Sequence, residues 1–393
     1  MTRIAIAAFA AMTTLLGLTA CGATEPAADG LVIDRPATDC GEPMPLAVVT
    51  SPHSNAPGLS LDAQMHCLVR ATVEAGLPLV IVKIDGVPDL LINKVLPVDD
   101  TNDTLRADSL DTAVYTTMAD ALRDAAPDED GADLVAGLDA AAQALRSHGV
   151  TSGRLLVTTP GLPDTGLLNM TQPGMLTADP HEVAQFTAEQ SRLDLAPFEV
   201  ILRGVGSTSA PQEPLAPVDR DKVVALLTEL LETAGATVVV VPMPSTVTTV
   251  NTPFSVGTTE VPEREAPDLV QTSEPIVFDQ SRIEFTPSST RLADPAEAAR
   301  FIRPVCEWLA EDPTRTATFT GTTATAGTPE GRRQLSRQRA SAAARLCEVD
   351  PARIRIVGAG TDHPDHVQDI DASGRLIPHL AAQNRTVRVQ PHN

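Results

Sequence analysis

Two arginines with a serine between them are the strongest candidates for ligand chemistry in this chain. Arg332 and Arg339 are seven residues apart, and Ser336 lies between them. In a helix, this spacing places all three side chains on one face. Guanidinium groups form charge-assisted hydrogen bonds with carboxylates and phosphates. The pattern predicts that this helix face binds an anion. The alternative is a solvated helix face whose arginines pair with nearby acids.

Other polar groups along the chain are weaker candidates. Residues 51–54 (Ser-Pro-His-Ser) follow a predicted strand, where open α/β sheets bind ligands, but the proline favours a turn as their role. Residues 362–369 hold two histidines among three aspartates, and we expect an exposed acidic loop rather than a metal site. No G-x-S-x-G elbow or Walker A sequence occurs, and residues 204–207 lack a third glycine for a dinucleotide turn. We therefore expect no enzyme, no cofactor and no metal site.

The N-terminus has the pattern of an export signal. Arg3 precedes an apolar run over residues 4–18 that is too short to span a bilayer comfortably. Residues 18–21 (Leu-Thr-Ala-Cys) resemble a bacterial lipobox, in which the cysteine receives a diacylglyceryl group after cleavage. The resemblance implies a signal peptide over residues 1–20 and a lipidated Cys21. It also implies anchoring at the extracytoplasmic face of the cell membrane, since two or more acyl chains anchor firmly.

Four cysteines remain besides the lipobox residue, namely Cys40, Cys67, Cys306 and Cys347. An even number in an exported chain indicates disulfides, and three pairings are possible. One pairing keeps each bridge inside a single predicted domain, and we favour it: Cys40–Cys67 with Cys306–Cys347. The absence of a C-x-x-C spacing disfavours a zinc site.

The first half of the chain alternates short apolar runs with helical patterns. The runs are short enough for buried strands and cover residues 46–49, 77–84, 154–158, 199–204 and 236–241. Apolar residues at three- and four-residue spacing predict helices over 61–75, 111–125, 131–147 and 219–234. Strands that alternate with helices favour a mainly parallel sheet covered on both faces. The fold class is therefore α/β, with a Rossmann-like sandwich over residues 41–242.

Composition divides the chain into further segments. Residues 21–40 are small and polar and read as a tether, and residues 243–274 are rich in Thr, Ser, Pro and Glu and read as a linker. From residue 275 onward, 15 arginines face 14 acidic residues, so the earlier part of the chain carries essentially all of the net charge of −22. An acidic half of this kind argues against nucleic acid as a partner. The arginine-rich second half, residues 275–393, is the better place for an anionic ligand.

This second half resembles the OmpA-like peptidoglycan-binding family. The resemblance rests on the order of several motifs: residues 282–292 as first strand and turn, the signature stretch 321–327, residues 335–340 (L-S-x-x-R-A), 358–360 (G-x-G) and 384–389 (N-R-x-V). It implies an α+β domain with helices over 295–310 and around 335–340, and strands over 316–322 and 354–358. It also places Thr323, Asn384 and Arg385 beside the two arginines and the serine as ligand-binding residues.

The chain departs from this family where the ligand chemistry is carried. Family members bind diaminopimelate, with an Asp on its amine and the Arg of L-S-x-x-R-A on its carboxylate. The Asp precedes that Arg by 15 residues, and this position holds Ala324 here. The usual Asn, seven residues before the Arg, is Arg332. A charge-assisted hydrogen bond contributes roughly 1.5–3 kcal/mol, so we expect either weakened wall binding or a purely anionic ligand.

The first half is weakly similar to von Willebrand factor type A (vWA) domains, which hold a divalent cation. Their D-x-S-x-S motif, metal-binding Thr and later Asp correspond to residues 50–54, Ala132 and Pro160 here. Hard cations need several oxygen ligands that include carboxylates, and none of these positions supplies the family's carboxylate or Thr. The resemblance therefore implies a vWA-like scaffold without its metal.

Together these patterns predict a non-enzymatic, lipid-anchored cell-envelope protein. Its partners would be the membrane through Cys21, peptidoglycan or another anionic wall polymer through the second half, and an unidentified envelope protein through the first half. The alternative is a solute-binding or sensor lipoprotein whose α/β domain binds a small ligand in the crevice at the carboxyl ends of its strands.

Overall fold

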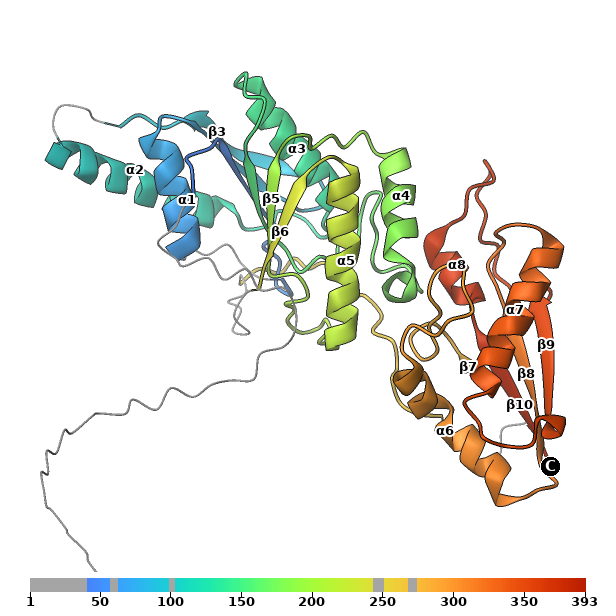
Figure 1. The fold of residues 1–393 in the computed structure, drawn as a ribbon. Coiled ribbons are helices and arrows are strands. Elements are labelled where there is room, and N and C mark those ends of the chain that lie inside the picture. Colours follow the sequence, from blue (N-terminus) through green and yellow to red (C-terminus); the bar gives the residue numbers. More distant parts are fainter. Residues whose placement is uncertain (1–40, 57–62, 99–102, 243–250, 268–273) are drawn as a thin grey trace, which may run out of the picture. The chain divides into compact units, whose positions relative to one another are not determined.

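The computed structural model describes residues 41–56, 63–98, 103–242, 251–267 and 274–393 (Figure 1). The predicted signal peptide, the tether, Cys21 and Cys40 lie outside these residues, so the pairing Cys40–Cys67 stays a prediction. In the described part of the chain, no helix combines the length and apolarity needed to cross a bilayer. The α/β class is confirmed, with one sheet in the N-terminal region (residues 41–242) and a second in the C-terminal region (residues 275–393).

The N-terminal region contains a six-stranded sheet in the order β3-β2-β1-β4-β5-β6. Its strands are β1 (Leu46–Thr50), β2 (Pro78–Lys83), β3 (Asp89–Val95), β4 (Arg154–Thr158), β5 (Glu199–Arg203) and β6 (Thr237–Val241). Strands β1, β2, β4, β5 and β6 are parallel, and β3 runs antiparallel to β2 at one edge. The five predicted strands are all present, and β3 is an addition.

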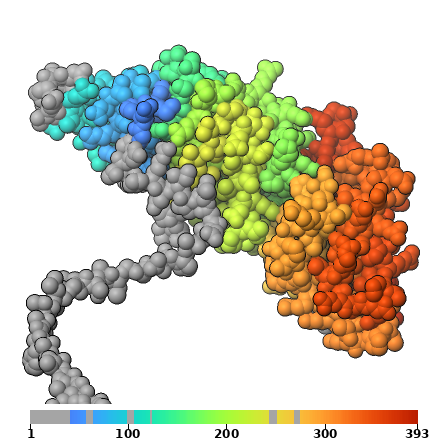
Figure 2. Space-filling view, viewed as in Figure 1, coloured from blue at the N-terminus to red at the C-terminus, as the bar shows by residue number. Residues whose placement is uncertain are grey.

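Helices cover both faces of this sheet, as the alternation of strands and helices predicts. The helices are α1 (Ala63–Glu74), α2 (Asp103–Asp124), α3 (Leu134–Ser147), α4 (Pro180–Gln190) and α5 (Pro217–Thr233). One apolar core lies between the sheet and α3, α4 and α5, and a second lies between the sheet and α1 and α2. Neighbouring residues of β1 alternate between the two cores, because successive side chains of a strand point to opposite faces. In the space-filling view, α5 contributes to the near surface (Figure 2).

The C-terminal region contains a four-stranded sheet in the order β7-β10-β8-β9. Its elements are β7 (Ile276–Phe278), α6 (Pro295–Glu311), β8 (Thr316–Thr322), α7 (Pro329–Ala344), β9 (Ile354–Gly360), α8 (Pro378–Asn384) and β10 (Val387–His392). Strand β10 is antiparallel to β7 and β8, whereas β8 and β9 are parallel. Of the first strand and turn predicted over residues 282–292, the strand is wrong, because it lies at 276–278. The segment contains the turn, which is flanked by a single bridge between Phe285 and Leu292.

The predicted disulfide Cys306–Cys347 is confirmed, with its Cα atoms 4.9 Å apart. Cys306 lies in α6 and Cys347 follows the end of α7, so the bridge joins two elements that pack on the same core. The pairing closes a loop across 41 residues of chain.

Two glycines let α7 lie unusually close to the sheet. A Cβ on Gly321 of β8 would lie 2.0 Å from the carbonyl oxygen of Ser336, and one on Gly358 of β9 would lie 2.2 Å from that of Arg333. Only glycine permits backbone contact this tight. These contacts determine where the residues of α7 sit above the ends of the strands.

The described part of the predicted linker, residues 251–267, packs on the N-terminal region. We call residues 254–259 the strap. The Asn55 side chain accepts from the Val256 N–H at 3.0 Å and donates to the Val256 carbonyl at 2.7 Å. The N–H groups of Ser255 and Gly257 donate to Asp130 and Asp164. The strap is therefore hydrogen-bonded to the loops that follow β1 and β4 and to the loop between α2 and α3.

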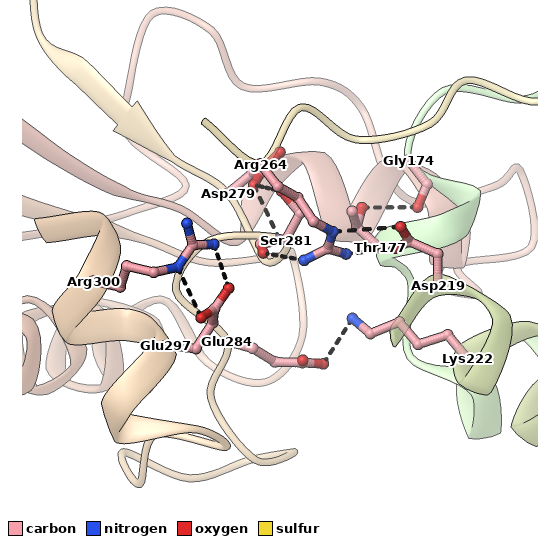
Figure 3. A network of polar contacts seen from close by, with 10 residues as sticks. All are labelled: Gly174, Thr177, Asp219, Lys222, Arg264, Asp279, Ser281, Glu284, Glu297 and Arg300. Carbon is pink, nitrogen blue, oxygen red and sulfur yellow. Dashed lines mark hydrogen bonds and ion pairs between the residues drawn. The ribbon is translucent and has the colours of Figure 1, made fainter. Parts of the chain in front are cut away.

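Beyond the strap, Arg264 bonds to both regions (Figure 3). Its guanidinium pairs with the fully buried Asp219 of α5 at 2.5 Å and donates to the Ser281 carbonyl at 2.9 Å. Lys222 of α5 pairs with Glu284 at 3.1 Å in the same network.

Candidate functional site

A cavity of about 160 Å³ lies at the end of β8, beside the first turns of α7. The end of β8 and the residues after it form one wall, and α7 forms another. The walls include three arginines, two acids from the start of α4 and one aromatic ring: Arg332, Arg339, Arg385, Asp179, Glu182 and Phe285. Cations from the C-terminal region and acids from the N-terminal region therefore face one space.

Arg339 is the most buried of these cations. Only 8% of the residue is exposed, and its guanidinium lies 5.1 Å from the centre of the Phe285 ring. Its Nε donates to the Ser289 carbonyl at 2.9 Å. Among the described residues, no carboxylate lies within ion-pair distance of this guanidinium. Burial, with a smaller contribution from Arg385, lowers the pKa of Arg339 to about 10, so the group stays charged at neutral pH.

Arg385 has a partner from the other region of the chain. Its guanidinium pairs with Oε1 of Glu182 at 2.6 Å, and both side chains are at least partly buried. The second carboxylate oxygen of Glu182, Oε2, is buried and has no hydrogen-bond partner. An acceptor in this state is energetically costly unless a ligand or water satisfies it.

Two further polar atoms near the cavity also lack partners. Arg332 donates through Nη1 to the Gly327 carbonyl at 2.7 Å, but its Nε is buried and unpaired. The hydroxyl of Thr323 is likewise buried and unpaired. Four of the predicted ligand-binding residues, Thr323, Arg332, Arg339 and Arg385, thus line one cavity.

The other two predicted residues, Ser336 and Asn384, have structural contacts instead. Ser336 is fully buried, accepts from the Gly360 N–H at 3.0 Å and donates to the Arg333 carbonyl at 3.0 Å. Asn384 is also fully buried, and its amide bonds to Asp369 and to both backbone groups of Val367. These bonds engage both side chains inside the fold, and neither residue lines the cavity.

The cavity also contains residues that sequence reasoning did not find. Asp179 and Glu182 precede the C-terminal region by about a hundred residues, and no motif connects them with the arginines. Phe285 lies in the segment that was predicted as a strand, so its place over a guanidinium was not expected. An Asp-Pro pair at residues 179–180 is a helix-start signal that could have located α4, though not its partner.

A second polar cluster lies at the carboxyl end of β2. The ammonium of Lys83 is 3.2 Å from Asp85, 3.2 Å from Asp89 and 2.6 Å from Asp128. Lys83 and Asp85 are each 1% exposed. Burial alone would lower the pKa of Lys83, but the hydrogen bonds that its ammonium donates to the three carboxylates outweigh this effect and raise the pKa well above its usual value. The side chain of Lys83 thus occupies the position among these carboxylates that a cation would take.

His53 and Ser51 form a buried pair after β1. The Ser51 hydroxyl lies 3.3 Å from Nδ1 of His53, and neither residue is more than 2% exposed. Burial lowers the pKa of His53, which opposes its protonation at neutral pH. Because the Ser54 N–H donates to the Phe254 carbonyl, the strap is fastened directly beside this pair. A serine and a histidine this deeply buried are inaccessible to a substrate.

The histidines of the predicted acidic loop contact each other. The ring centres of His363 and His366 are 5.5 Å apart, edge to face. Within the described ranges, the carboxylates around Lys83 are the one group of acidic, histidine or cysteine ligands close enough together to hold a metal. The loop does not assemble such a group.

Comparison with known proteins gave matches among solved structures alone. No family model and no curated protein matches the chain. The peptidoglycan-associated lipoprotein from Burkholderia pseudomallei is 24% identical, with a TM-score of 0.23 over 28% of this chain and 88% of that one. A MotB-like protein from Desulfovibrio vulgaris is 18% identical, with a TM-score of 0.24 over 30% and 74%. An outer membrane protein from Borrelia burgdorferi is 21% identical, with a TM-score of 0.22 over 30% and 91%. Each match is confined to less than a third of this chain.

Proposed function

We propose that this chain is a non-enzymatic, lipid-anchored envelope protein whose C-terminal region binds a carboxylate of peptidoglycan or of another anionic wall polymer. The lipobox-like residues 18–21 support the anchor, and the ordered OmpA-like motifs support the C-terminal assignment. The boundaries at residues 242 and 275 and the tether over 21–40 belong to this proposal.

The observation that carries the proposal is the buried guanidinium of Arg339, which has no acidic partner among the described residues. Burying a charge without an opposite charge is costly, and proteins retain such groups where a partner compensates them. Here the described protein supplies a carbonyl and an aromatic face but no carboxylate. The guanidinium lines a cavity, so an anionic ligand group would supply the missing partner.

The expected strength of this contact is moderate. A charge-assisted hydrogen bond contributes roughly 1.5–3 kcal/mol, which corresponds to about one to two orders of magnitude in affinity. Ala324, at the position of the family's acid, is apolar and only 3% exposed, so it adds no charge to the site. A single site would then bind weakly, and membrane anchoring would raise its effective concentration at the wall.

For the N-terminal region we propose an interaction scaffold of vWA-like type that contacts another envelope protein. The strand order β3-β2-β1-β4-β5-β6 with an antiparallel β3 supports this assignment. The strap bonds to loops at the carboxyl ends of the strands, where open sheets of this kind bind ligands. Its position disfavours the alternative of a small-molecule sensor at that edge.

Co-sedimentation with purified sacculi tests the main proposal. The full-length chain, kept in solution with a mild detergent, is compared with Arg339→Ala and with Arg337→Ala, an exposed arginine on the same helix. We expect the wild type and Arg337→Ala to pellet and Arg339→Ala to lose most of its retention. A thermal melt of each variant verifies folding. Equal retention of a folded Arg339→Ala protein would refute the assignment.

A further inference from the structure

Charges of both signs face the cavity beside α7, and they come from two distant parts of the chain. Arg332 and Arg339 belong to α7, while Asp179 and Glu182 belong to the start of α4. A cavity lined by guanidinium groups alone would favour a simple anion. A cavity that also presents carboxylates favours a ligand with a positive group beside its negative one, because charge complementarity determines specificity.

Glu182 is held at this cavity by packed structure. The side chain of Gln383 in α8 donates to the Pro173 carbonyl at 2.7 Å, and Ala382 of α8 belongs to the apolar core of the N-terminal region. Gly174 lies so close to α8 that a Cβ there would be 2.5 Å from the His379 carbonyl oxygen. The short helix Met175–Thr177 and α4 both contact α8. The start of α4 is therefore placed by these contacts, independently of the ion pair.

The ion pair engages only half of the Glu182 carboxylate. Oε1 pairs with Arg385, and Oε2 is buried with no partner. Glu182 and Arg339 line the same cavity, and the Glu182 charge partly opposes the lowering of the Arg339 pKa by burial. Both residues line the cavity, so within the described residues it presents a guanidinium without an acidic partner beside a carboxylate with one unpaired oxygen.

We propose that the cavity binds an α-amino carboxylate, with the ligand carboxylate on Arg339 and the ligand ammonium on the carboxylate of Glu182. The inference rests on the proposed function and adds the group that recognises the ammonium. Ala324 leaves the C-terminal region without an acid at the position where the OmpA-like resemblance expects one. Glu182 supplies that charge from the N-terminal region, so the two regions complete a single site.

The competing interpretation is that Glu182 blocks the site by holding the place of a ligand carboxylate. The two interpretations predict opposite effects of removing its charge. If Glu182 binds an ammonium, Glu182→Gln weakens the binding of a zwitterion and leaves that of a plain dicarboxylate nearly unchanged. If Glu182 blocks the site, the same substitution strengthens the binding of both.

Calorimetric titration of the full-length chain in detergent with two matched probes separates these cases. The probes are meso-diaminopimelate and pimelate, which has the same carboxylates and chain length but no amines. We expect the wild type to prefer diaminopimelate by about tenfold or more. Glu182→Gln should abolish this preference, and the double variant Glu182→Gln with Ala324→Asp should restore it. Glu232→Gln, an exposed acid on α5, is the charge-matched control.

The outcomes also distinguish this inference from the proposed function. Loss of binding of both probes in Arg339→Ala supports the carboxylate site that both proposals share. A wild type that binds the two probes equally, or a Glu182→Gln protein that binds either more tightly, overturns the role of Glu182 alone. If the Ala324→Asp protein binds diaminopimelate and the wild type does not, the role of Glu182 is likewise overturned. If neither the wild type nor Ala324→Asp binds either probe, the proposed function fails as well.

Discussion

Replacing Lys83 by methionine should reveal how much the buried ammonium stabilises the N-terminal region. Two of its three ion pairs involve exposed acids, since the side chains of Asp89 and Asp128 are 55% and 82% exposed. Pairs of that kind contribute about 0–1 kcal/mol each. The third partner, Asp85, is 1% exposed, and one of its carboxylate oxygens already lacks a hydrogen bond. The burial of Asp85 therefore dominates the expected effect.

Removing one member of a buried ion pair typically costs about 3–5 kcal/mol, because the remaining charge is left without compensation. For a region of this size, we expect the melting temperature of Lys83→Met to fall by roughly 10 °C. The substitution would also leave three carboxylates whose oxygens lie within 4.8 Å of one another. Calcium ions, which prefer oxygen ligands, should then restore part of the lost stability in the variant but not in the wild type.

The assay is thermal unfolding monitored by circular dichroism, with and without millimolar calcium. Lys94→Met is the matched control, since Lys94 is exposed on β3 and its loss should change the free energy of unfolding little. A loss below about 1 kcal/mol in Lys83→Met would refute the reasoning, because the ammonium would then contribute no more than a surface ion pair does. A calcium effect of equal size in the wild type would refute the rescue.

Two further predictions concern the covalent and polar links described above. The double variant Cys306→Ser with Cys347→Ser opens a loop of 41 residues. It should destabilise the C-terminal region by about 4 kcal/mol on the loop-entropy estimate. Urea unfolding measures this loss of stability, and a change under about 1 kcal/mol would contradict the prediction. Asn55→Ala removes both hydrogen bonds to Val256, so the strap should lose about 1–3 kcal/mol of local stability and be cleaved faster in limited proteolysis. Unaltered cleavage rates would show that other contacts hold the strap.

The buried parallel strands could be predicted from the sequence because each is a short, continuous apolar run. Strand β3 could not be predicted because it lacks such an apolar run. It is an edge strand with both faces largely exposed, and its sequence, with Asp89, Asn93 and Lys94, has no clear alternation. Helix α2 extends from residue 103, well before the predicted start at 111, through a polar stretch that carries little helical periodicity. The short strand β7 spans only three residues, too few for a pattern.

Only those residues of the candidate site that belong to a sequence motif could be predicted. Arg332 and Arg339 were found from their spacing and from the family pattern around them. Ser336 and Asn384 belong to the same motifs, yet polar side chains of this kind serve equally well as ligands or as internal hydrogen-bond partners. Glu182 could not be found at all, because its pairing with Arg385 spans 203 residues and depends on tertiary packing.

The strap has a consequence for the order in which the chain assembles. All six strands of the N-terminal sheet precede residue 242, but the partners of Asn55 lie 201 residues further along the chain. Closing a contact over such a separation costs loop entropy that only a largely formed sheet can offset. During synthesis, the strands can therefore pair before residues 254–259 have emerged, and the strap closes last. A fragment cut at residue 242 would lack the N–H groups of Ser255 and Gly257, which donate to Asp130 and Asp164. The smallest self-contained N-terminal fragment therefore extends through the strap.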